Sequence, residues 1–363
     1  MGEIRKHIAV ICNYELLESR VGGMDYFFWA FNKACQGQHI EVDWFFPNTS
    51  AHGDYAAFKI SPSENHPLEQ HFLNHIKTQQ VQYSHIITHF VELCTSFYAN
   101  IKKLQTAIII AVDHNPRPLK GYPLKKRLKK RLKGMLYSKY VDVFIGVSNY
   151  TSQAILHDFG NHIKPKTQTI YNGVYMDTII PKITERRRKN PKFLVVSHLR
   201  ESKGIQDLIS AVSLLSEEFK ATLSIDVYGD GPYKSELLHL VSNHHLESVL
   251  HFKGSQSHLK TLYQHYDYLI QPTHMECFSL SILESLAANI PVITTPVGGN
   301  TEVITHNKNG FIFETKNSQA LSGLLDDIIK GETYIIGNTR TLIEDQFSMK
   351  RMVQKHLELL KNN

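Results

Sequence analysis

The chain has 363 residues, of which 42% are hydrophobic and 20% are charged, with 17 Tyr and 18 Phe. This composition supplies enough apolar side chains for a packed core and excludes a disordered chain, and the length favours two domains. The formal net charge is +6, but residues 120–133 hold eight Lys or Arg and no acid. The remaining 32 bases are balanced by 34 acids. The positive charge is therefore local, which argues against a general nucleic-acid-binding protein and indicates one anionic surface or partner.

The N-terminal apolar run, IAVIC, is too short for the hydrophobic region of a signal peptide. No stretch of about 18 uninterrupted apolar residues follows it, so no membrane-spanning helix is predicted. The four cysteines contain no C-x-x-C pair, which favours reduced thiols: Cys12, Cys35, Cys94 and Cys277. We expect a cytoplasmic protein, for which peripheral contact with the inner face of the membrane remains open.

Short β-branched or aromatic runs alternate with longer helical patterns, which is typical of βαβ units and a parallel sheet. The predicted strands of the first half begin near residues 8, 40, 85, 107, 141 and 167, and those of the second half near 193, 223, 249, 266, 291 and 310. We expect Rossmann-like domains at 1–178 and 193–346, joined by a polar linker at 179–192. An amphipathic helix in 347–363 is expected to pack back on the first domain.

Two features of the first half follow predicted strands, and ligands of doubly wound sheets bind beyond the carboxyl ends of the strands. Gly22 and Gly23 follow the first strand and permit a tight turn at the start of a helix. His114 ends the run AIIIAVDH, where an imidazole can hydrogen-bond a ligand hydroxyl. The alternatives are a plain turn for the glycines and an ordinary histidine, one of 21, for His114.

The basic segment 120–136 predicts an amphipathic helix, because its apolar residues recur at helical spacing with Lys and Arg between them. Those apolar residues are Leu124, Leu128, Leu132, Met135 and Leu136. Such a helix can lie on an anionic membrane, which favours a lipid-linked acceptor. The alternative is a surface helix whose apolar stripe faces its own core.

The second half carries two charged loops after predicted strands. The first is SHLRESKG at 197–204, with Arg200 and Lys203. The second lies within PTHMECFSLSILESLAANIPVITTPVGG at 272–299, in which Glu276 and Glu284 flank a strand-to-helix turn. Ser279 is a candidate N-cap, so the backbone N–H groups of the helix would face an anion such as a diphosphate. The two carboxylates suit sugar hydroxyls, which donate well to charged acceptors.

Segment 272–299 closely resembles the E-x7-E signature of the retaining family-four glycosyltransferases, which have the GT-B fold. Weaker matches extend the resemblance over nearly the whole chain: Gly22-Gly23, IYNGV at 170–174, SHLRESKG and YGDGP at 228–232. Both IYNGV and YGDGP are also compatible with plain turns.

The resemblance implies roles for named residues. Glu276 would lie against the donor sugar with His114 near it, and Glu284 would face the ribose hydroxyls. Gly22, Gly23 and Lys203 would hold the donor diphosphate. The other donor-binding residues that we expect are Arg200, Ser279 and Leu280.

Three positions depart from the family pattern. Cys277 and Ser279 stand where Gly is more frequent, and His198 stands where the family has an Arg. If the chain is extended through SHLR, residues 198 and 200 project to the same side, so that Arg200 supplies the missing phosphate contact.

These features predict an α/β protein of GT-B type that transfers a sugar, with retention, from a nucleoside-diphosphate sugar to a hydroxyl of a glycan or lipid-linked acceptor. Cell-surface polysaccharide or glycoconjugate synthesis is the expected setting. No cofactor is expected, since the nucleotide sugar is a co-substrate, and the absence of a D-x-D pair disfavours a catalytic metal. The alternatives are a GT-B sugar-nucleotide epimerase or hydrolase, and a catalytically silent nucleotide- or glycan-binding scaffold.

Overall fold

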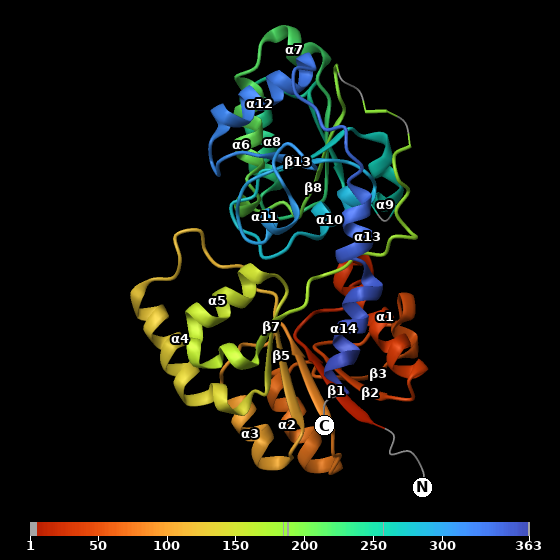
Figure 1. Cartoon of the computed structure of the whole chain (residues 1–363), viewed down its shortest axis with the longest axis vertical. Helices are drawn as coiled ribbons and strands as arrows, with labels where there is room; N and C mark the ends of the chain where they lie inside the picture. The colour runs from red at the N-terminus through yellow and green to blue at the C-terminus, as the bar shows by residue number, and fades with distance from the viewer. Residues whose placement is uncertain (1–5, 184, 187–188, 257, 362–363) are drawn as a thin grey trace. The chain divides into compact units, whose positions relative to one another are not determined.

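The computed structural model describes residues 6–183, 185, 186, 189–256 and 258–361. The chain divides into two compact units: unit 1 comprises 1–172 and 349–363, and unit 2 comprises 173–348. Figure 1 colours the chain from red at its beginning to blue at its end. Residues 1–5 and 362–363 of the expected outer segments, and residues 184, 187 and 188 of the expected linker, lie outside the described residues.

Unit 1 contains a parallel sheet in the order β3-β2-β1-β4-β5-β6-β7 (Figure 1). Its strands are β1 His7–Cys12, β2 Glu41–Phe46, β3 Lys59–Pro62, β4 His85–His89, β5 Ile108–Asp113, β6 Val143–Gly146 and β7 Thr167–Thr169. The α-helices of this unit are α1 Gly23–Gly37, α2 Leu68–Gln79, α3 Ser96–Leu104, α4 Leu124–Tyr137, α5 Asn149–Phe159 and α14 Met349–Leu359. Short 3-10 turns complete it: η1 Glu18–Arg20, η2 Gly53–Ala57, η3 Ser138–Tyr140 and η4 Asn161–Lys166.

Helix α14 returns the end of the chain to unit 1, as the sequence predicted. It packs against α1, with the ring of His356 4.7 Å from the ring of Phe27. One face of α14 is buried, which the helical spacing of its apolar residues explains.

Unit 2 contains a second parallel sheet, in the order β10-β9-β8-β11-β12-β13. Its strands are β8 Phe193–Val196, β9 Ile225–Tyr228, β10 Leu250–Gly254, β11 Tyr268–Gln271, β12 Val292–Thr294 and β13 Gly310–Ile312. Its α-helices are α6 Ile205–Ser213, α7 Glu217–Thr222, α8 Lys234–Asn243, α9 Leu259–Leu262, α10 Leu280–Ala287, α11 Asn300–Val303, α12 Ser318–Lys330 and α13 Arg340–Gln346. The 3-10 turns are η5 Glu201–Lys203 and η6 Tyr263–His265.

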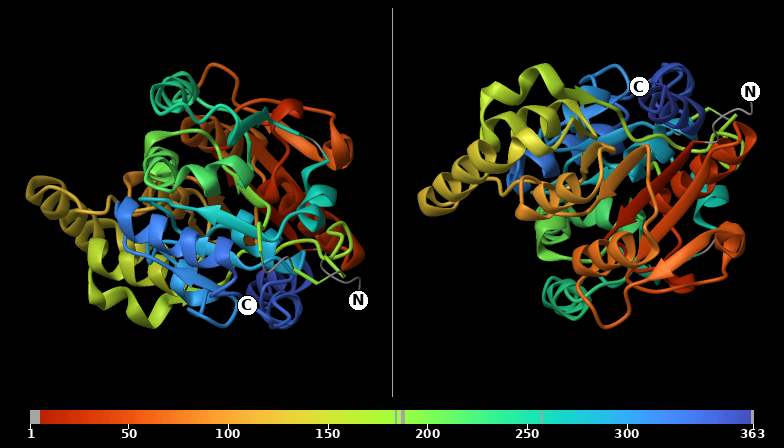
Figure 2. Two further views of the ribbon diagram at one scale, coloured as in Figure 1. Left: turned by 90° about the horizontal axis from the view of Figure 1, so that it is seen from above. Right: turned by 90° about the horizontal axis from the view of Figure 1, so that it is seen from below.

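The central strands are buried on both faces because helices cover both sides of each sheet (Figure 2). In β1, every residue from Ile8 to Cys12 is fully buried. Full burial of a Val, Leu or Ile side chain stabilises the fold by about 1.5–3 kcal/mol, so continuous apolar runs are favoured over alternating ones. This is why the strands are readable from the sequence as short uninterrupted β-branched runs.

The structure differs from the sequence expectations at one strand and at the unit boundaries. The additional strand is β3, an edge strand that ends in Pro62, and proline in a short polar run is a poor strand signal. The chain changes units at 172/173 and 348/349, not at 178/179 and 346/347. The segment expected as a linker is bound to unit 2, because Lys182 N–H donates to Ala288 O at 2.8 Å and Arg186 donates to Asn289 O at 2.9 Å.

The strand order of each sheet determines where a ligand can bind. Both sheets grow outward in two directions from their first strand, so β1 lies between β2 and β4, and β8 lies between β9 and β11. At such a reversal the connections leave to opposite sides and open a crevice beyond the carboxyl ends of the strands. A ligand of this fold would therefore lie against the loops that follow β1 and β4 in unit 1, or β8 and β11 in unit 2.

Candidate functional site

Lys203 and Glu276 meet at the reversal point of unit 2. Lys203 ends η5, the turn that follows β8, and Glu276 lies in the loop that follows β11, the strand next to β8. Lys203 Nζ donates to Glu276 Oε2 at 2.8 Å, and both side chains remain partly exposed. Two residues 73 positions apart in the sequence thus form one charged pair where a ligand of this fold would bind.

Two glycines allow the loops of this pair to approach closely. Gly204 follows Lys203 with φ +69°, and a Cβ there would lie 1.9 Å from Pro272 O. Gly298 follows β12 with φ +61°, and a Cβ there would lie 2.1 Å from Glu276 O. Any other residue would be both strained and obstructed at these positions. The Gly-Gly pair of the 272–299 segment therefore supports the loop that carries Glu276.

Helix α10 begins at this loop, and Ser279 caps it as predicted. The Ser279 hydroxyl accepts from Ile282 N–H at 3.4 Å, and Leu280 is the first residue of the helix. Gln271, the last residue of β11, donates its amide to Ser279 Oγ at 2.5 Å. Gln271 Oε1 is buried and has no hydrogen-bond partner among the described residues. The N-terminus of α10 thus combines unpaired helical N–H groups with a buried amide, which suits a polar or anionic ligand.

Glu284 lies one turn further along α10 and is half-buried. Its Oε2 accepts from the Tyr263 hydroxyl at 3.1 Å. Burial raises the pKa of Glu284, while the charge of Lys260 and the hydrogen bond from Tyr263 oppose that shift. The sequence did not reveal Tyr263, because η6 lies in a polar segment with no motif.

A second pair that the sequence did not reveal supports the Glu276 loop from the other side. His274 Nε2 lies 2.5 Å from Asp207 Oδ2 on α6, and His274 N–H donates to Ser202 O at 2.8 Å. These contacts tie the loop after β11 to the turn after β8. The position of His274 just after a predicted strand was an available signal, whereas nothing in the sequence marks Asp207.

Arg200 and His198 are both exposed. The premise that the chain is extended through SHLR is wrong, because Arg200 N–H donates to His198 O at 2.9 Å, which closes a γ-turn at Leu199. Alternation along a strand therefore does not relate the two side chains. The Arg200 guanidinium makes no hydrogen bond or ion pair in the described part of the chain, and its role at a diphosphate stays a prediction.

In unit 1, Gly22 and Gly23 form the start of α1, after β1. Gly22 N–H donates to Asp25 Oδ2 at 2.8 Å, which closes the first turn of the helix. Asp25 is buried and also accepts from the hydroxyls of Tyr14 at 2.8 Å and Tyr55 at 2.7 Å. A Cβ on Gly22 would meet only ordinary contacts, so the fold itself does not require glycine there.

His114 follows β5 directly and belongs to a buried cluster of histidines. Its Nε2 lies 2.9 Å from His89 Nδ1, and its ring stacks on Phe90 at 4.4 Å. Burial lowers the pKa of His114 to about 4, against the opposing charge of Asp113. Burial likewise lowers the pKa of His356, on α14, to about 4, and holds that of His89 well below its ordinary value. His114 is therefore neutral near pH 7, able to hydrogen-bond but not to carry charge.

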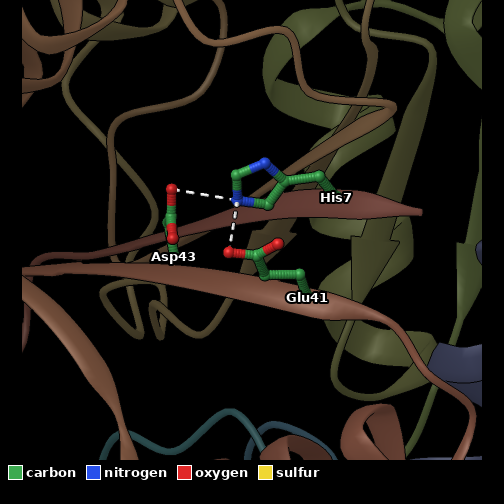
Figure 3. Close-up of side chains that lie close together, drawn as sticks. All are labelled: His7, Glu41 and Asp43. Carbon is green, nitrogen blue, oxygen red and sulfur yellow. Dashed lines mark ion pairs between the residues drawn. The ribbon is translucent and has the colours of Figure 1, made fainter. Parts of the chain in front are cut away.

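Among the described residues, a single group of side chains is close enough to hold a metal ion: His7, Glu41 and Asp43 (Figure 3). His7 Nε2 lies 3.0 Å from Asp43 Oδ2 and 3.9 Å from Glu41 Oε1. Lys59 Nζ already lies 2.8 Å from Asp43 and 3.2 Å from Glu41, so an ammonium occupies the position of a cation. The group also lies in the first halves of β1 and β2, away from their carboxyl ends. It is a charge network that joins three strands.

Residues 176–348 match the family described as Glycosyl transferases group 1. The match spans nearly all of unit 2. The match covers the Lys203–Glu276 pair, the capped start of α10 and both supporting glycines.

Curated relatives match over part of their length. The N-acetyl-alpha-D-glucosaminyl L-malate synthase of Bacillus anthracis is 27% identical over 217 residues, which cover 56% of this chain and 56% of that protein. The GtfA subunit of a UDP-N-acetylglucosamine–peptide N-acetylglucosaminyltransferase from Limosilactobacillus reuteri subsp. suis is 30% identical over 178 residues, or 48% of this chain and 34% of the relative. The chain thus spans about half or less of the length of these relatives.

The fold as a whole is shared with solved glycosyltransferase structures. HepE of Anabaena, solved in complex with UDP and glucose, aligns with a TM-score of 0.76 at 17% identity over 99% of this chain and all of that one. The predicted GT-B class, with two Rossmann-like units built on parallel sheets, is thereby confirmed.

Proposed function

We propose that this chain is a retaining glycosyltransferase that moves a sugar from a nucleoside-diphosphate sugar to a hydroxyl of a glycan or lipid-linked acceptor. The observation that carries the proposal is the 2.8 Å pair of Lys203 and Glu276 at the reversal point of a group 1 domain. The relatives support a nucleotide-sugar donor, since one is named for UDP-N-acetylglucosamine and HepE was solved with UDP and glucose. Cell-surface polysaccharide or glycoconjugate synthesis is the setting we propose.

The donor diphosphate would be stabilised by positive charge and by the start of α10. Lys203 has three N–H donors, so it can keep Glu276 and still contact phosphate oxygens. Arg200 is exposed and would add a guanidinium, and the N-terminal N–H groups of α10 at Ser279 and Leu280 would complete the anion site. Stabilising the charge that develops on a leaving group is the interaction most effective in lowering the barrier.

The sugar would be positioned by Glu276, whose carboxylate accepts from sugar hydroxyls, and by the neutral imidazole of His114. The bond from the anomeric carbon to the diphosphate breaks while the bond to the acceptor oxygen forms on the same face. The acceptor proton leaves with the departing diphosphate or passes to solvent. No side chain is assigned as a nucleophile, and Lys203 with the start of α10 takes the place of a metal ion in this proposal.

Two further parts of the proposal concern Glu284 and Gly22-Gly23. Glu284 is half-buried on α10 and would accept from the ribose hydroxyls of the donor. Gly22 and Gly23 would let the backbone at the start of α1 approach the donor phosphates.

The test is a binding screen of the full chain against a panel of nucleotide sugars, followed by product analysis with and without acceptors. Transfer with retained anomeric configuration would support the proposal. Turnover of the donor without any acceptor would indicate an epimerase or hydrolase, and binding without turnover would indicate a catalytically silent scaffold.

EDTA should leave transfer nearly unchanged. A loss of transfer that magnesium reverses would show that the reaction requires a metal ion.

The assignment of Glu276 and Glu284 is tested by Glu276→Ala and Glu284→Ala, each of which should strongly reduce transfer without unfolding the protein. Glu236→Ala, at an exposed carboxylate on α8, is the matched control and should retain full activity. Full activity in Glu276→Ala or Glu284→Ala would show that the substituted residue is not part of the site.

A further inference from the structure

Helix α4 packs on unit 1 with its polar side facing inward. Gly134 is buried, and a Cβ there would lie 2.0 Å from Phe159 O, so α4 approaches the backbone of α5 as closely as a glycine allows. On the same side, Lys130 pairs with Asp158 at 3.1 Å, and Lys133 pairs with Glu92 at 2.5 Å. A lysine and glycine face thus occupies the position that an apolar face usually takes.

The apolar side of α4 is left exposed. Its five large apolar side chains are between 51% and 68% exposed: Leu124, Leu128, Leu132, Met135 and Leu136. The alternative in which this stripe faces its own core is therefore wrong. Both views of Figure 2 show α4, coloured gold, at the outer margin of its unit, with α5 beside it.

Exposed bases line both edges of the stripe. With 3.6 residues per turn, Lys125 and Lys129 lie along one edge, and Arg127 and Arg131 lie along the other. No acidic residue occurs between residues 120 and 136. The face is therefore an apolar stripe between two rows of positive charge.

We propose that this face of α4 binds the surface of an anionic phospholipid bilayer, with the leucines inserted among the acyl chains and the bases at the phosphate level. A helix that lies in the interface buries its apolar face about 5–10 Å below the headgroups while its bases contact anionic lipids. At 14 residues α4 is short for spanning, and among the described residues no helix has the length and apolar character to cross a bilayer.

Other occupants fit the face less well. A second copy of the chain would bring two positive faces together, which costs free energy. A nucleic acid would pair its phosphates with the Lys and Arg side chains of α4. It would leave the five exposed apolar side chains without a role, because binding of nucleic acid depends mainly on contacts to phosphates. A bilayer uses both features. The inference does not depend on the reaction proposed above, although it favours a lipid-linked acceptor over a soluble one.

The first experiment measures sedimentation of the full chain with vesicles of phosphatidylcholine alone and with phosphatidylglycerol added, in the absence of donor and acceptor. We expect binding to the anionic vesicles only. A variant with Lys125→Gln, Lys129→Gln and Arg131→Gln should bind about a hundredfold more weakly, since each charge near the surface contributes about fivefold. The matched control removes the same charge from exposed positions on α1, α2 and α3, with Lys33→Gln, Lys77→Gln and Lys103→Gln, and should bind like the parent.

The second experiment tests insertion. Leu128→Trp should be quenched by brominated lipids, whereas Leu214→Trp, at an equally exposed leucine of unit 2, should not. Leu128→Gln with Leu132→Gln should weaken binding at least tenfold without lowering the unfolding temperature, because both side chains are exposed in the folded chain. Transfer to a soluble acceptor should survive in every variant of this helix.

Three results would overturn the proposal. One is equal sedimentation with neutral and anionic vesicles, and another is a charge variant that binds as tightly as the parent. The third is tighter binding to single-stranded RNA than to vesicles at the same salt, which would assign the face to a nucleic acid. None of these three results depends on the transfer reaction, so loss of membrane binding and loss of the proposed activity are distinguishable.

Discussion

Units 1 and 2 share one scaffold but present different chemistry where their strand order reverses. In unit 2 the segments after β8 and β11 form ionisable pairs, Lys203 with Glu276 and Asp207, on helix α6, with His274. In unit 1 the buried carboxylate of Asp25 follows β1, and the ends of β4 and β5 carry aromatic rings, with His114 hydrogen-bonded to His89 and stacked on Phe90. The parallel sheet thus determines where loops gather, and the loops determine which side chains gather there.

The largest effect should come from removing positive charge in unit 2. Lys203→Ala should lower the donor kcat/KM by about 2–4 kcal/mol of transition-state stabilisation, because a charge at the leaving group is lost. We expect nearly the same loss from Arg200→Ala, although Arg200 holds no partner in the described chain that would orient it. Lys308→Ala, an exposed lysine of the same unit, is the control. If Lys203→Ala and the control have equal kcat/KM, the assignment of an anion site to unit 2 is wrong.

Acid should destabilise unit 1 through its buried histidines. The unfolded pKa of histidine is about 6.5, whereas His114 and His356 have folded pKa values of about 4. Between these values the unfolded state binds more protons, so stability is full above pH 6.5 and falls as the pH is lowered toward 4. At pH 5.5 each of these two histidines should lower the free energy of unfolding by about 1.4 kcal/mol relative to its value well above pH 6.5.

The measurement is urea unfolding of the chain between pH 7.5 and 5, with hydrogen exchange to assign the loss to unit 1. His356→Leu should reduce the pH dependence of the free energy of unfolding by the contribution of one histidine. Any loss of packing should lower that free energy equally at every pH. His244→Gln, an exposed histidine of unit 2, should leave the dependence unchanged. A parent protein whose stability is constant from pH 7.5 to 5 would contradict the assignment of neutral buried imidazoles.

Gly298 should be the most sensitive glycine of the Glu276 loop. Gly298→Ala should destabilise unit 2 by about 1–3 kcal/mol, because the new Cβ would meet Glu276 O in a left-handed backbone conformation. Gly323→Ala is the matched control, since it lies within α12 with no heavy atom near the new Cβ, and it should stabilise the chain by up to about 1 kcal/mol. The unfolding temperatures of both variants test this prediction. Equal shifts in unfolding temperature would show that the loop carrying Glu276 tolerates a side chain at position 298.

The sequence predicted the features that depend on local pattern. Buried parallel strands appear as continuous apolar runs, and Ser279 before α10 is a local capping signal. The pairing of His274 with Asp207 depends on tertiary structure, and a one-dimensional pattern does not contain it. The orientation of α4 is similar: the 3.6-residue period shows which side chains share a face but not whether that face points inward. Gly134 was the signal for its orientation, because a glycine opposite the leucines permits the close approach to Phe159.

The smallest effect should come from His198, the position where the resembling family has an arginine. His198 is exposed, it contributes its backbone carbonyl to the γ-turn at Leu199, and an imidazole carries no permanent charge near pH 7. His198→Ala should therefore change the donor kcat/KM by less than about 0.5 kcal/mol at pH 8, within the range of ordinary surface substitutions.

Measuring the donor kcat/KM of His198→Ala, Arg200→Ala and Lys203→Ala from pH 5.5 to 8 shows which side chain supplies the positive charge. If the imidazolium contacts the diphosphate, the defect of His198→Ala grows as the pH falls, because only the parent gains a charge there. A growing defect together with a silent Arg200→Ala would assign the phosphate contact to protonated His198 and leave Arg200 as surface charge. A defect that is flat with pH would leave the proposed anion site of unit 2 to Lys203, Arg200 and the start of α10 across the whole pH range.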